Sequence, residues 1–248
     1  MPLRYKYHAV QVQCVPMSRP PSQHRPRKRF GQNFLRDPGV VHRIASAIHP
    51  REGQHLVEIG PGQGALTEAL VLSGCQLDVI ELDRDLVPGL LAAFSIHPRF
   101  RLHSADALRF DFASLAAGDE RLRVVGNLPY NIATPLIFRL LENTALIEDM
   151  HFMLQLEVVE RLAAQPGNKD WGRLGIMAQY HCRVEHLFNV PPEAFRPPPK
   201  VQSAVVRLVP HREHPWPDCD RADLQRAVQA AFAQRRKTLR NNLKGLIE

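Results

Sequence analysis

The stretch "HLVEIGPGQGALT", His55 to Thr67, decides the predicted fold. Its first residues are an apolar run typical of a buried strand, three glycines follow at alternate positions, and the next segment reads as a helix that Gly74 closes. Glycines in such a turn let the backbone approach a nucleotide closely, and the N-terminus of the helix faces the ligand. The stretch therefore predicts the ligand-binding turn of an open α/β sheet.

Segments of the same two kinds alternate along the rest of the chain. The expected strands cover residues 55–60, 76–82, 100–106, 123–127, 150–155, 183–190 and 203–209. Helical segments separate most of them, and strands that alternate with helices form a mostly parallel sheet that is covered on both faces. We therefore expect a doubly wound α/β fold with seven strands.

Both ends of the chain differ from this core. Residues 1–36 contain neither Asp nor Glu, and prolines interrupt any amphipathic helix there, so we expect a disordered basic arm over residues 1–26. After Pro210 the pattern becomes helical and basic. We therefore divide the chain into the arm, a Rossmann-like domain over residues 27–210 and a small helical domain over residues 211–248.

The composition indicates a globular protein with an acidic partner. Lys and Arg number 32 against 25 Asp and Glu, a net charge of +7 over 248 residues, which favours nucleic acid as the partner. No apolar run approaches the ~20 residues that a membrane-spanning helix needs. The cysteines form no Cys-x-x-Cys pair, so we expect neither a zinc site nor disulfides, and a cytoplasmic location: Cys14, Cys75, Cys182 and Cys219.

Two carboxylates follow the glycine turn at the ends of the next strands. Glu81 ends the second expected strand, and Asp106 ends the third. Ligands of open α/β sheets bind at the carboxyl ends of the strands, where Glu81 can accept both hydroxyls of a ribose and Asp106 can accept from an adenine amine.

The turn itself allows two interpretations. The spacing Gly60-x-Gly62-x-x-Ala65 fits the dinucleotide-binding fingerprint. However, the Gly-x-Gly-x-Gly spacing, the preceding Glu58 and the internal Pro61 together resemble the S-adenosylmethionine-binding turn of class I methyltransferases.

The tetrapeptide Asn127-Leu128-Pro129-Tyr130 ends the fourth expected strand. An adenine exocyclic amine is a poor nucleophile because its lone pair is delocalised into the ring. The side-chain oxygen of Asn127 and the carbonyl of Pro129 can each accept one amino hydrogen, which would aim the lone pair at a sulfonium methyl without a general base or a metal. Tyr130 offers a stacking face for an extruded base. The tetrapeptide therefore predicts methyl transfer to an amine.

Seven segments together resemble the ribosomal RNA adenine N6-dimethyltransferases: "RKRFGQNFL", "VEIGPGQGALT", "VIELDRDL", "GNLPYNIATPLIF", "HFMLQLEVVERL", "EAFRPPPKVQSAVVRL" and "AFAQRRKTLRNNL". The resemblance spans about Arg27 to Leu243 and is greatest to the bacterial members, which dimethylate two adjacent adenosines of 16S rRNA. It implies a class I S-adenosylmethionine-dependent methyltransferase domain followed by a small helical domain. The implied partner is 16S rRNA in the small ribosomal subunit or its precursor, and we expect a monomer without metal or membrane.

The resemblance also assigns residues to the site. The implied cofactor contacts are Asn33, Leu35, Gly60, Gly62, Glu81, Asp106 and Asn127. Phe195, in "AFRPPPK", is implied to be a second aromatic ring against the target base, in addition to Tyr130.

Two basic clusters are expected to contact RNA phosphates: Arg27, Lys28 and Arg29 in the first, and Arg235, Arg236, Lys237 and Arg240 in the second. The chain departs from the family pattern in three ways. It stops at Glu248, where members continue, so we expect an incomplete helical domain. Residues 1–24 match nothing in the pattern, and Leu156 stands where Lys is usual.

Three other functions stay open on the sequence. A DNA adenine methyltransferase usually carries Asp, or Asn followed by two prolines, at the tetrapeptide. A ribosome-assembly factor would bind RNA with vestigial catalysis. A nicotinamide dehydrogenase leaves the tetrapeptide unexplained.

Overall fold

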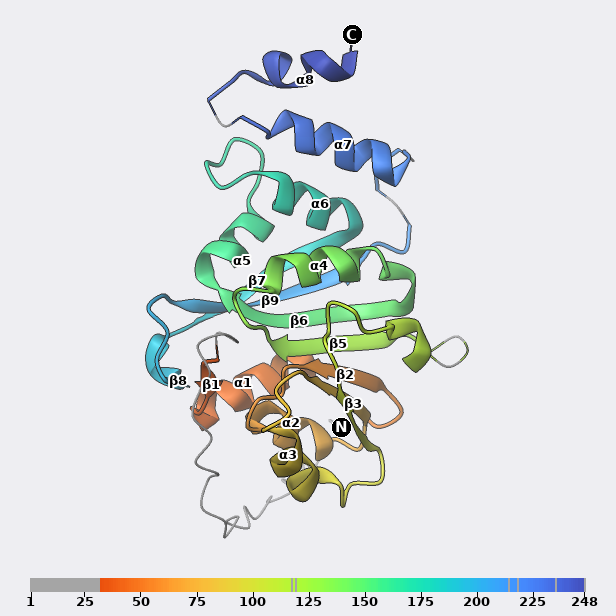
Figure 1. Cartoon of the computed structure of the whole chain (residues 1–248), viewed down its shortest axis with the longest axis vertical. Coiled ribbons are helices and arrows are strands. Elements are labelled where there is room, and N and C mark those ends of the chain that lie inside the picture. Colours follow the sequence, from red (N-terminus) through yellow and green to blue (C-terminus); the bar gives the residue numbers. More distant parts are fainter. Residues whose placement is uncertain are drawn as a thin grey trace, which may run out of the picture.

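The structure, a computed structural model, describes residues 32–247 except 117, 119, 214, 218 and 235. Its centre is a seven-stranded sheet in the order β4-β3-β2-β5-β6-β9-β7 (Figure 1). The strands are β2 (His55–Ile59), β3 (Gln76–Glu81), β4 (Phe100–Ser104), β5 (Leu122–Asn127), β6 (Ile147–Gln155), β7 (Cys182–Val190) and β9 (Ser203–Pro210). All seven strands predicted from the sequence are confirmed.

The strand directions place several strand ends at one edge of the sheet. β2 lies between β3 and β5, and the pairs from β4 through β6 are parallel. β9 runs antiparallel to both β6 and β7. The order of the chain reverses at β2, and such a switch point is where open α/β sheets bind ligands.

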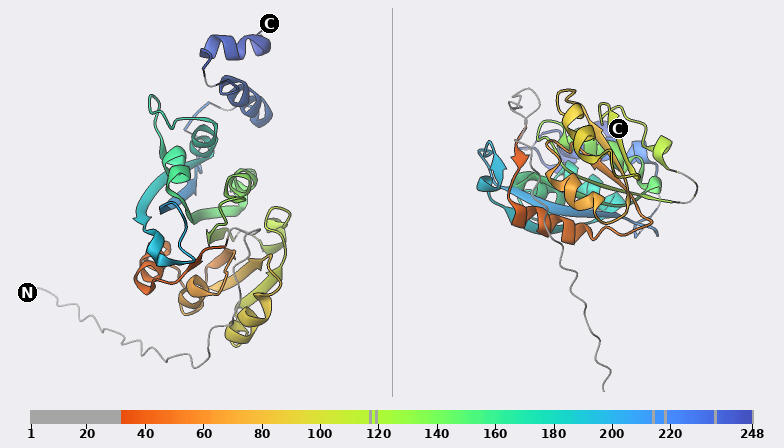
Figure 2. Two further views of the ribbon diagram at one scale, coloured as in Figure 1. Left: turned by 60° about the vertical axis from the view of Figure 1, so that its left-hand side comes forward. Right: turned by 90° about the horizontal axis from the view of Figure 1, so that it is seen from below.

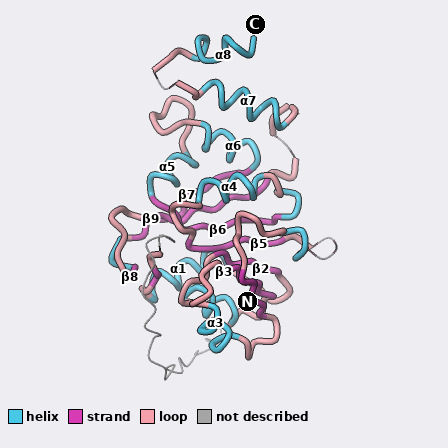
Figure 3. The backbone as a smooth tube through the Cα atoms, in the orientation of Figure 1, coloured by secondary structure: helices cyan, strands magenta, loops and turns pink. Residues whose placement is uncertain are grey.

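Helices cover both faces of the sheet (Figure 3). They are α1 (Pro38–Ile48), α2 (Ala65–Val71), α3 (Val87–Phe94), α4 (Ala133–Leu141), α5 (Leu156–Ala163) and α6 (Arg173–His181), with 3₁₀ turns at Phe112–Leu115, Thr144–Leu146 and Pro192–Ala194. Alternate residues of β2 face opposite sides: Leu56 packs in one cluster with α1 and α2, and Val57 packs in another with α4, α5 and α6. This double burial explains the continuous apolar run of β2.

Two features of the fold were not expected from the sequence. β1 (Phe34–Leu35) and β8 (Phe195–Arg196) form a separate two-stranded antiparallel sheet. α6 contains Gly175, where a Cβ would lie 2.4 Å from the carbonyl oxygen of Arg161, so the glycine allows α6 to approach α5 closely. Both features depend on contacts between distant segments, which a local pattern does not record.

Beyond Pro210 the chain forms α7 (Arg221–Ala231) and α8 (Leu239–Ile247). The side chain of Asp220 caps α7 by accepting from the backbone N–H groups of Ala222 and Asp223. Figures 1 and 2 show these helices extending past α6, at the opposite end of the molecule from α3. The division into domains stays a prediction. No helix in the described part of the chain has the length and apolarity to cross a membrane.

A buried ion pair joins β5, β6 and α1. The Arg123 guanidinium donates to both carboxylate oxygens of Asp149 at 2.9 Å, and it also donates to the carbonyl of Ile48 at 2.6 Å, at the end of α1. Arg123 is 7% exposed and Asp149 4%. The pair is bidentate and buried, and Arg123 also bonds the end of α1, so it fixes α1 against the centre of the sheet.

We expect Arg123→Ala to lower the free energy of unfolding by roughly 3 kcal/mol or more, since it leaves the Asp149 carboxylate buried without its main partner. Urea denaturation at neutral pH measures this. Arg121→Ala is the control, because Arg121 is half exposed and lies 3.7 Å from Glu148 at the surface. The free energy of unfolding should fall by less than about 1 kcal/mol in this control variant. Equal losses in the two variants would contradict the role given to Arg123.

Candidate active site

A pocket lies where the carboxyl ends of β2, β3 and β5 meet at the switch point. Its lining includes nine of the residues predicted from the sequence: Asn33, Leu35, Gly60, Gly62, Glu81, Asp106, Asn127, Pro129 and Tyr130. The fold therefore brings into one cavity residues that lie up to about a hundred positions apart in the chain.

The glycine turn after β2 forms one wall of the pocket. Gly60 and Gly62 have φ of +68° and +60°, the left-handed region that favours glycine. A Cβ at Gly62 would lie 3.0 Å from the ring of Phe34. The conformation of the turn thus depends on residues without side chains, and its backbone is open to a ligand.

Two carboxylates stand where the sequence predicted them. Glu81 accepts from the N–H of Gly62 at 3.2 Å and from that of Asp83 at 2.8 Å, while burial raises its pKa. Asp106 accepts from the N–H of Leu108 at 2.9 Å through one oxygen, and its second oxygen is left for a ligand. Each carboxylate is held in place by backbone and keeps acceptor capacity toward the pocket.

Glu58 lies buried beneath the turn, at 2% exposure. The hydroxyl of Thr67 donates to its Oε2 at 2.6 Å. Burial raises the pKa of Glu58 to about 8; the Thr67 bond opposes this rise, and the nearby Glu81 carboxylate adds to it. The Glu58 carboxyl therefore holds a proton at neutral pH in the ligand-free protein.

Residues 32–36, here called the N-terminal strap, connect two other sides of the pocket. Gln32 donates to Oδ2 of Asp83 at 2.9 Å, beyond the end of β3. Arg36 donates to the side-chain oxygen of Gln63 in the glycine turn. The strap also carries β1, whose pairing with β8 attaches it to the chain segment after β7.

Asn127 ends β5 directly against the glycine turn. The preceding residue is Gly126, where a Cβ would lie 2.4 Å from the carbonyl oxygen of Ile59, so only glycine allows this approach. The Asn127 Nδ2 donates to the main-chain oxygen of Asn33 in the strap at 3.1 Å. This bond sets which way the amide points, and the side-chain oxygen accepts no hydrogen bond from the described residues.

The predicted role of the Pro129 carbonyl stays a prediction, and the structure shows which hydrogen bonds it already makes. The carbonyl oxygen accepts from the N–H groups of Ile132 and Ala133, each at 3.1 Å, where α4 begins. A carbonyl oxygen has two lone pairs, so a substrate amine at this oxygen would compete with the two bonds from α4. The carbonyl of Leu128 has no hydrogen-bond partner among the described residues, and Leu128 also lines the pocket.

Tyr130 lines the pocket and is half-buried. Its hydroxyl lies 2.8 Å from Oγ of Ser203, the first residue of β9. Burial raises the pKa of the Tyr130 hydroxyl, and the bond to Ser203 opposes that rise. The ring is therefore neutral, tethered at its hydroxyl end and adjacent to the cavity.

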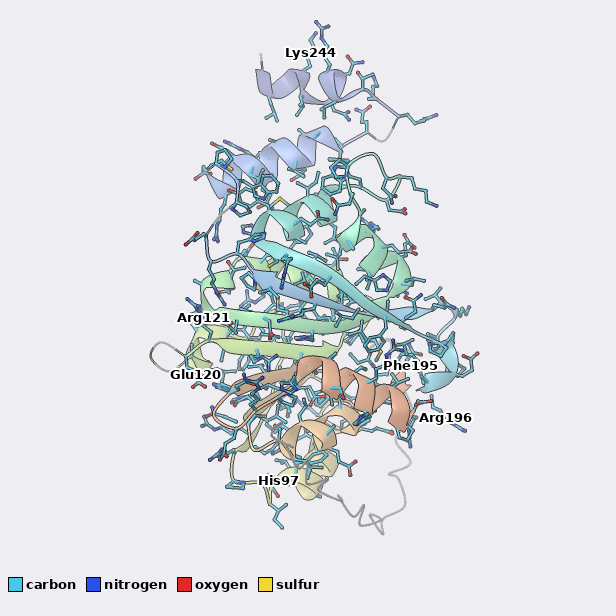
Figure 4. All side chains as sticks on the ribbon, turned by 180° about the vertical axis from the view of Figure 1, so that it is seen from behind. His97, Glu120, Arg121, Phe195, Arg196 and Lys244 are labelled. Atoms are coloured by element: carbon cyan, nitrogen blue, oxygen red, sulfur yellow. The ribbon has the colours of Figure 1, made fainter. Side chains whose placement is uncertain are left out.

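The predicted role of Phe195 against the target base stays a prediction. Phe195 is 2% exposed, pairs with Leu35 across the β1–β8 sheet, and packs in the apolar cluster with α1 and α2. It is absent from the pocket lining, so its ring offers no free face to a base in this structure. In this structure Phe195 packs beside Leu35 of β1, while its neighbour Arg196 is exposed at the same edge (Figure 4).

Only some of the residues predicted to contact RNA lie in the described part of the chain. Arg27, Lys28, Arg29 and Arg235 lie outside the described residues. Arg236, Lys237 and Arg240 are exposed between α7 and the first turn of α8, the helix on which Figure 4 labels Lys244. Their role in binding RNA stays a prediction. Within the described ranges, no group of three or more His, Cys, Asp or Glu residues is suited to a metal ion.

Sequence reasoning missed three parts of the site. These are the contacts of the strap through Gln32 and Arg36, the free carbonyl of Leu128, and the hydroxyl of Ser203. Only Ser203 had a local signal, since it opens an expected strand at the edge where the ligand site was placed. The other two depend on which polar groups the folded chain leaves engaged or free.

The seven-stranded order, the glycine turn and the acidic strand ends together define a Rossmann-like methyltransferase of class I. The chain belongs to the ribosomal RNA adenine dimethylase family, whose model matches residues 23–248.

Sequence relatives are similar over most of the chain. The ribosomal RNA small subunit methyltransferase A of Pseudomonas aeruginosa is 70% identical over 225 residues, which cover 91% of this chain and 84% of the relative. The protein of the same name from Chromohalobacter salexigens is 62% identical over 235 residues, 93% of this chain and 83% of the relative.

Two solved structures share the fold. A dimethyladenosine transferase from Plasmodium falciparum aligns with a TM-score of 0.74 at 27% identity, covering 85% of this chain and 74% of that one. The 23S rRNA methyltransferase ErmE aligns with a TM-score of 0.71 at 29% identity, covering 86% and 84%.

We expect the stability of the ligand-free protein to depend on the Glu58 proton. Unfolding lowers the pKa of this carboxyl from about 8 to its ordinary value of 4.5, so the folded state holds a proton that the unfolded state lacks between these pH values. Stability therefore falls as pH rises from about 5 to 8, by roughly 3–5 kcal/mol in total from this group. Glu58→Gln has no proton to lose, so its stability relative to the wild type should increase as pH rises.

Thermal unfolding midpoints between pH 5 and 8.5 measure this difference. Glu68→Gln, which changes an exposed carboxylate of α2, is the control and should follow the wild type. If Glu58→Gln also follows the wild-type pH dependence, the buried proton is not present.

Proposed function

We propose that this protein transfers methyl groups from S-adenosylmethionine to the N6 amines of two adjacent adenosines in 16S rRNA, giving N6,N6-dimethyladenosine during small-subunit biogenesis. The observation that carries this is the apposition of Asn127 and the glycine turn. A Cβ at Gly60 would lie 3.7 Å from the main-chain oxygen of Asn127, so the donor site and the acceptor site share one wall. The names of the relatives support rRNA of the small subunit as the substrate.

The residues present fit S-adenosylmethionine, which supplies a methyl group activated by a positively charged sulfur. Gly60 and Gly62 leave the backbone open beside the pocket, which suits close approach of the ligand. Glu81 has acceptor capacity for ribose hydroxyls, and the free oxygen of Asp106 suits an adenine amine. Asn33 and Leu35 of the strap line the opposite side.

In this proposal the tetrapeptide holds the target amine. The side-chain oxygen of Asn127 and the carbonyl of Leu128 each accept one hydrogen of N6, which directs the nitrogen lone pair toward the glycine turn. The ring of Tyr130 stacks on the extruded base. The protein contributes position and electrostatics, and no side chain has to remove the amine proton before transfer.

The second methylation meets the same residues with one hydrogen fewer. Monomethylation replaces one N–H of the amine, so only one of the two acceptors, Asn127 or Leu128, can be used afterwards. The pocket must also admit the added methyl. Because one hydrogen bond to the amine is lost, the position of the base then depends more on stacking against Tyr130.

The RNA surface is also part of the proposal. Arg236, Lys237 and Arg240 are exposed, and the net charge of +7 suits a phosphate backbone. We place the protein in the cytoplasm as a monomer that binds 16S rRNA in the small subunit or its precursor.

The direct test uses purified protein, S-adenosylmethionine with a labelled methyl group, and small subunits that lack the modification. Nucleoside analysis of the recovered 16S rRNA should show label in N6,N6-dimethyladenosine. Label in adenines of duplex DNA and none in rRNA would assign a DNA methyltransferase instead. Binding of the subunits with no label in either acceptor would indicate an assembly factor.

We expect Asn127→Ala to reduce single-turnover methyl transfer about 100-fold or more, because the amine loses the acceptor that orients it. The variant should keep its thermal unfolding midpoint within a few degrees. Asn143→Ala is a matched control, since the Asn143 amide donates to the carbonyl of Arg139 at 2.9 Å, away from the pocket. An unchanged rate in Asn127→Ala would reject the assigned role.

A further inference from the structure

The hydroxyl of Tyr130 is tied to a buried anchor. Its oxygen lies 2.8 Å from Oγ of Ser203, and Ser203 is 0% exposed. The two residues are 73 positions apart, so the bond joins the loop after β5 to the antiparallel half of the sheet. The ring of Tyr130 faces the pocket at one end of the side chain, and the hydroxyl is held at the other.

Ser203 is suited to be a fixed point. As the first residue of β9 it pairs with Gln155 of β6 on one side and with Val190 of β7 on the other. Its backbone is therefore held by two neighbouring strands, whereas Tyr130 belongs to a turn between β5 and α4. We therefore take Ser203 as the fixed partner of this hydrogen bond and Tyr130 as the side chain that it holds in place.

We propose that Ser203 is a positioning residue for the target base, which holds the Tyr130 ring at the pocket by fixing its hydroxyl end and matters most for the second methyl transfer. This inference rests on the function proposed above. Ser203 itself touches neither the base nor the cofactor in the proposal; it acts through Tyr130.

The physical reason is the changing balance of contacts on the amine. Before the first transfer, two acceptors and the stacked ring hold the base, and loss of one constraint is tolerated. After it, one N–H remains, so one acceptor and the ring must hold the base against the added methyl. A side chain that can change rotamer must be ordered anew in each complex, and that entropy cost opposes productive stacking.

The test compares Ser203→Ala, Tyr130→Phe and the double variant in single-turnover reactions on unmodified small subunits. The separate rate constants come from time courses of monomethyl- and dimethyladenosine. We expect the second rate constant to fall about 10-fold, the worth of one such hydrogen bond, and the first to fall about 3-fold or less. Monomethyladenosine should therefore accumulate.

The double variant gives the sharper result. Because both single changes remove the same bond, the double variant should match either single variant instead of showing the product of their effects. Tyr130→Phe keeps the ring and leaves no buried hydroxyl unpaired at position 130, so it remains informative if Ser203→Ala proves unstable.

Two further measurements separate positioning from a general structural effect. Ser73→Ala removes a hydroxyl that donates to the carbonyl of Leu70 at 2.8 Å and does not line the pocket, and it should leave the product ratio unchanged. Fluorescence of 2-aminopurine at the target position of an RNA fragment reports base extrusion without methyl transfer, and its rise on binding should be smaller in Ser203→Ala than in the wild type.

An unchanged product ratio in both single variants would overturn the inference, as would multiplicative effects in the double variant. These results differ from failure of the proposed function, in which the wild-type protein itself would form no methylated adenosine in 16S rRNA.

Discussion

The parallel pairing of β2 with β5 is the contact on which the rest of the site depends. Their register opposes Glu58 to Val125, so the two strands end side by side, one in the glycine turn and the other in Asn127. The approach is so close that a Cβ at Gly126 would lie 2.4 Å from the backbone of Ile59. The glycine turn and the tetrapeptide, which lie far apart in the chain, therefore line one cavity, as the proposed transfer between two bound molecules requires.

Two distant segments then complete the tetrapeptide from opposite sides. The strap supplies the Asn33 carbonyl, which accepts from the nitrogen of Asn127. In the proposed function, the side-chain oxygen of Asn127 then accepts from the amine. β9 supplies the Ser203 hydroxyl, which holds Tyr130. The β1–β8 pairing connects the strap to the segment that leads into β9. The side chains of Asn127 and Tyr130 are thus both held by hydrogen bonds from outside their own loop.

The sequence predicted the parts of this arrangement that have a local cause. Apolar runs revealed all seven strands of the main sheet, and the glycine spacing with Glu81 and Asp106 located the ligand edge. It failed where tertiary contacts decide. The two-residue strands of the small sheet have no pattern of their own, and the burial of Phe195 depends on that pairing. Only the start of α4 shows which hydrogen bonds the Pro129 carbonyl accepts.

The orientation of Asn127 is the central claim, and a structure of the protein with an RNA fragment and S-adenosylhomocysteine tests it most directly. The account predicts the side-chain oxygen of Asn127 at about 2.7–3.2 Å from N6 of the extruded adenine, with its nitrogen still donating to Asn33. A reversed amide, or an N6 held by other groups with Asn127 out of contact, would contradict it.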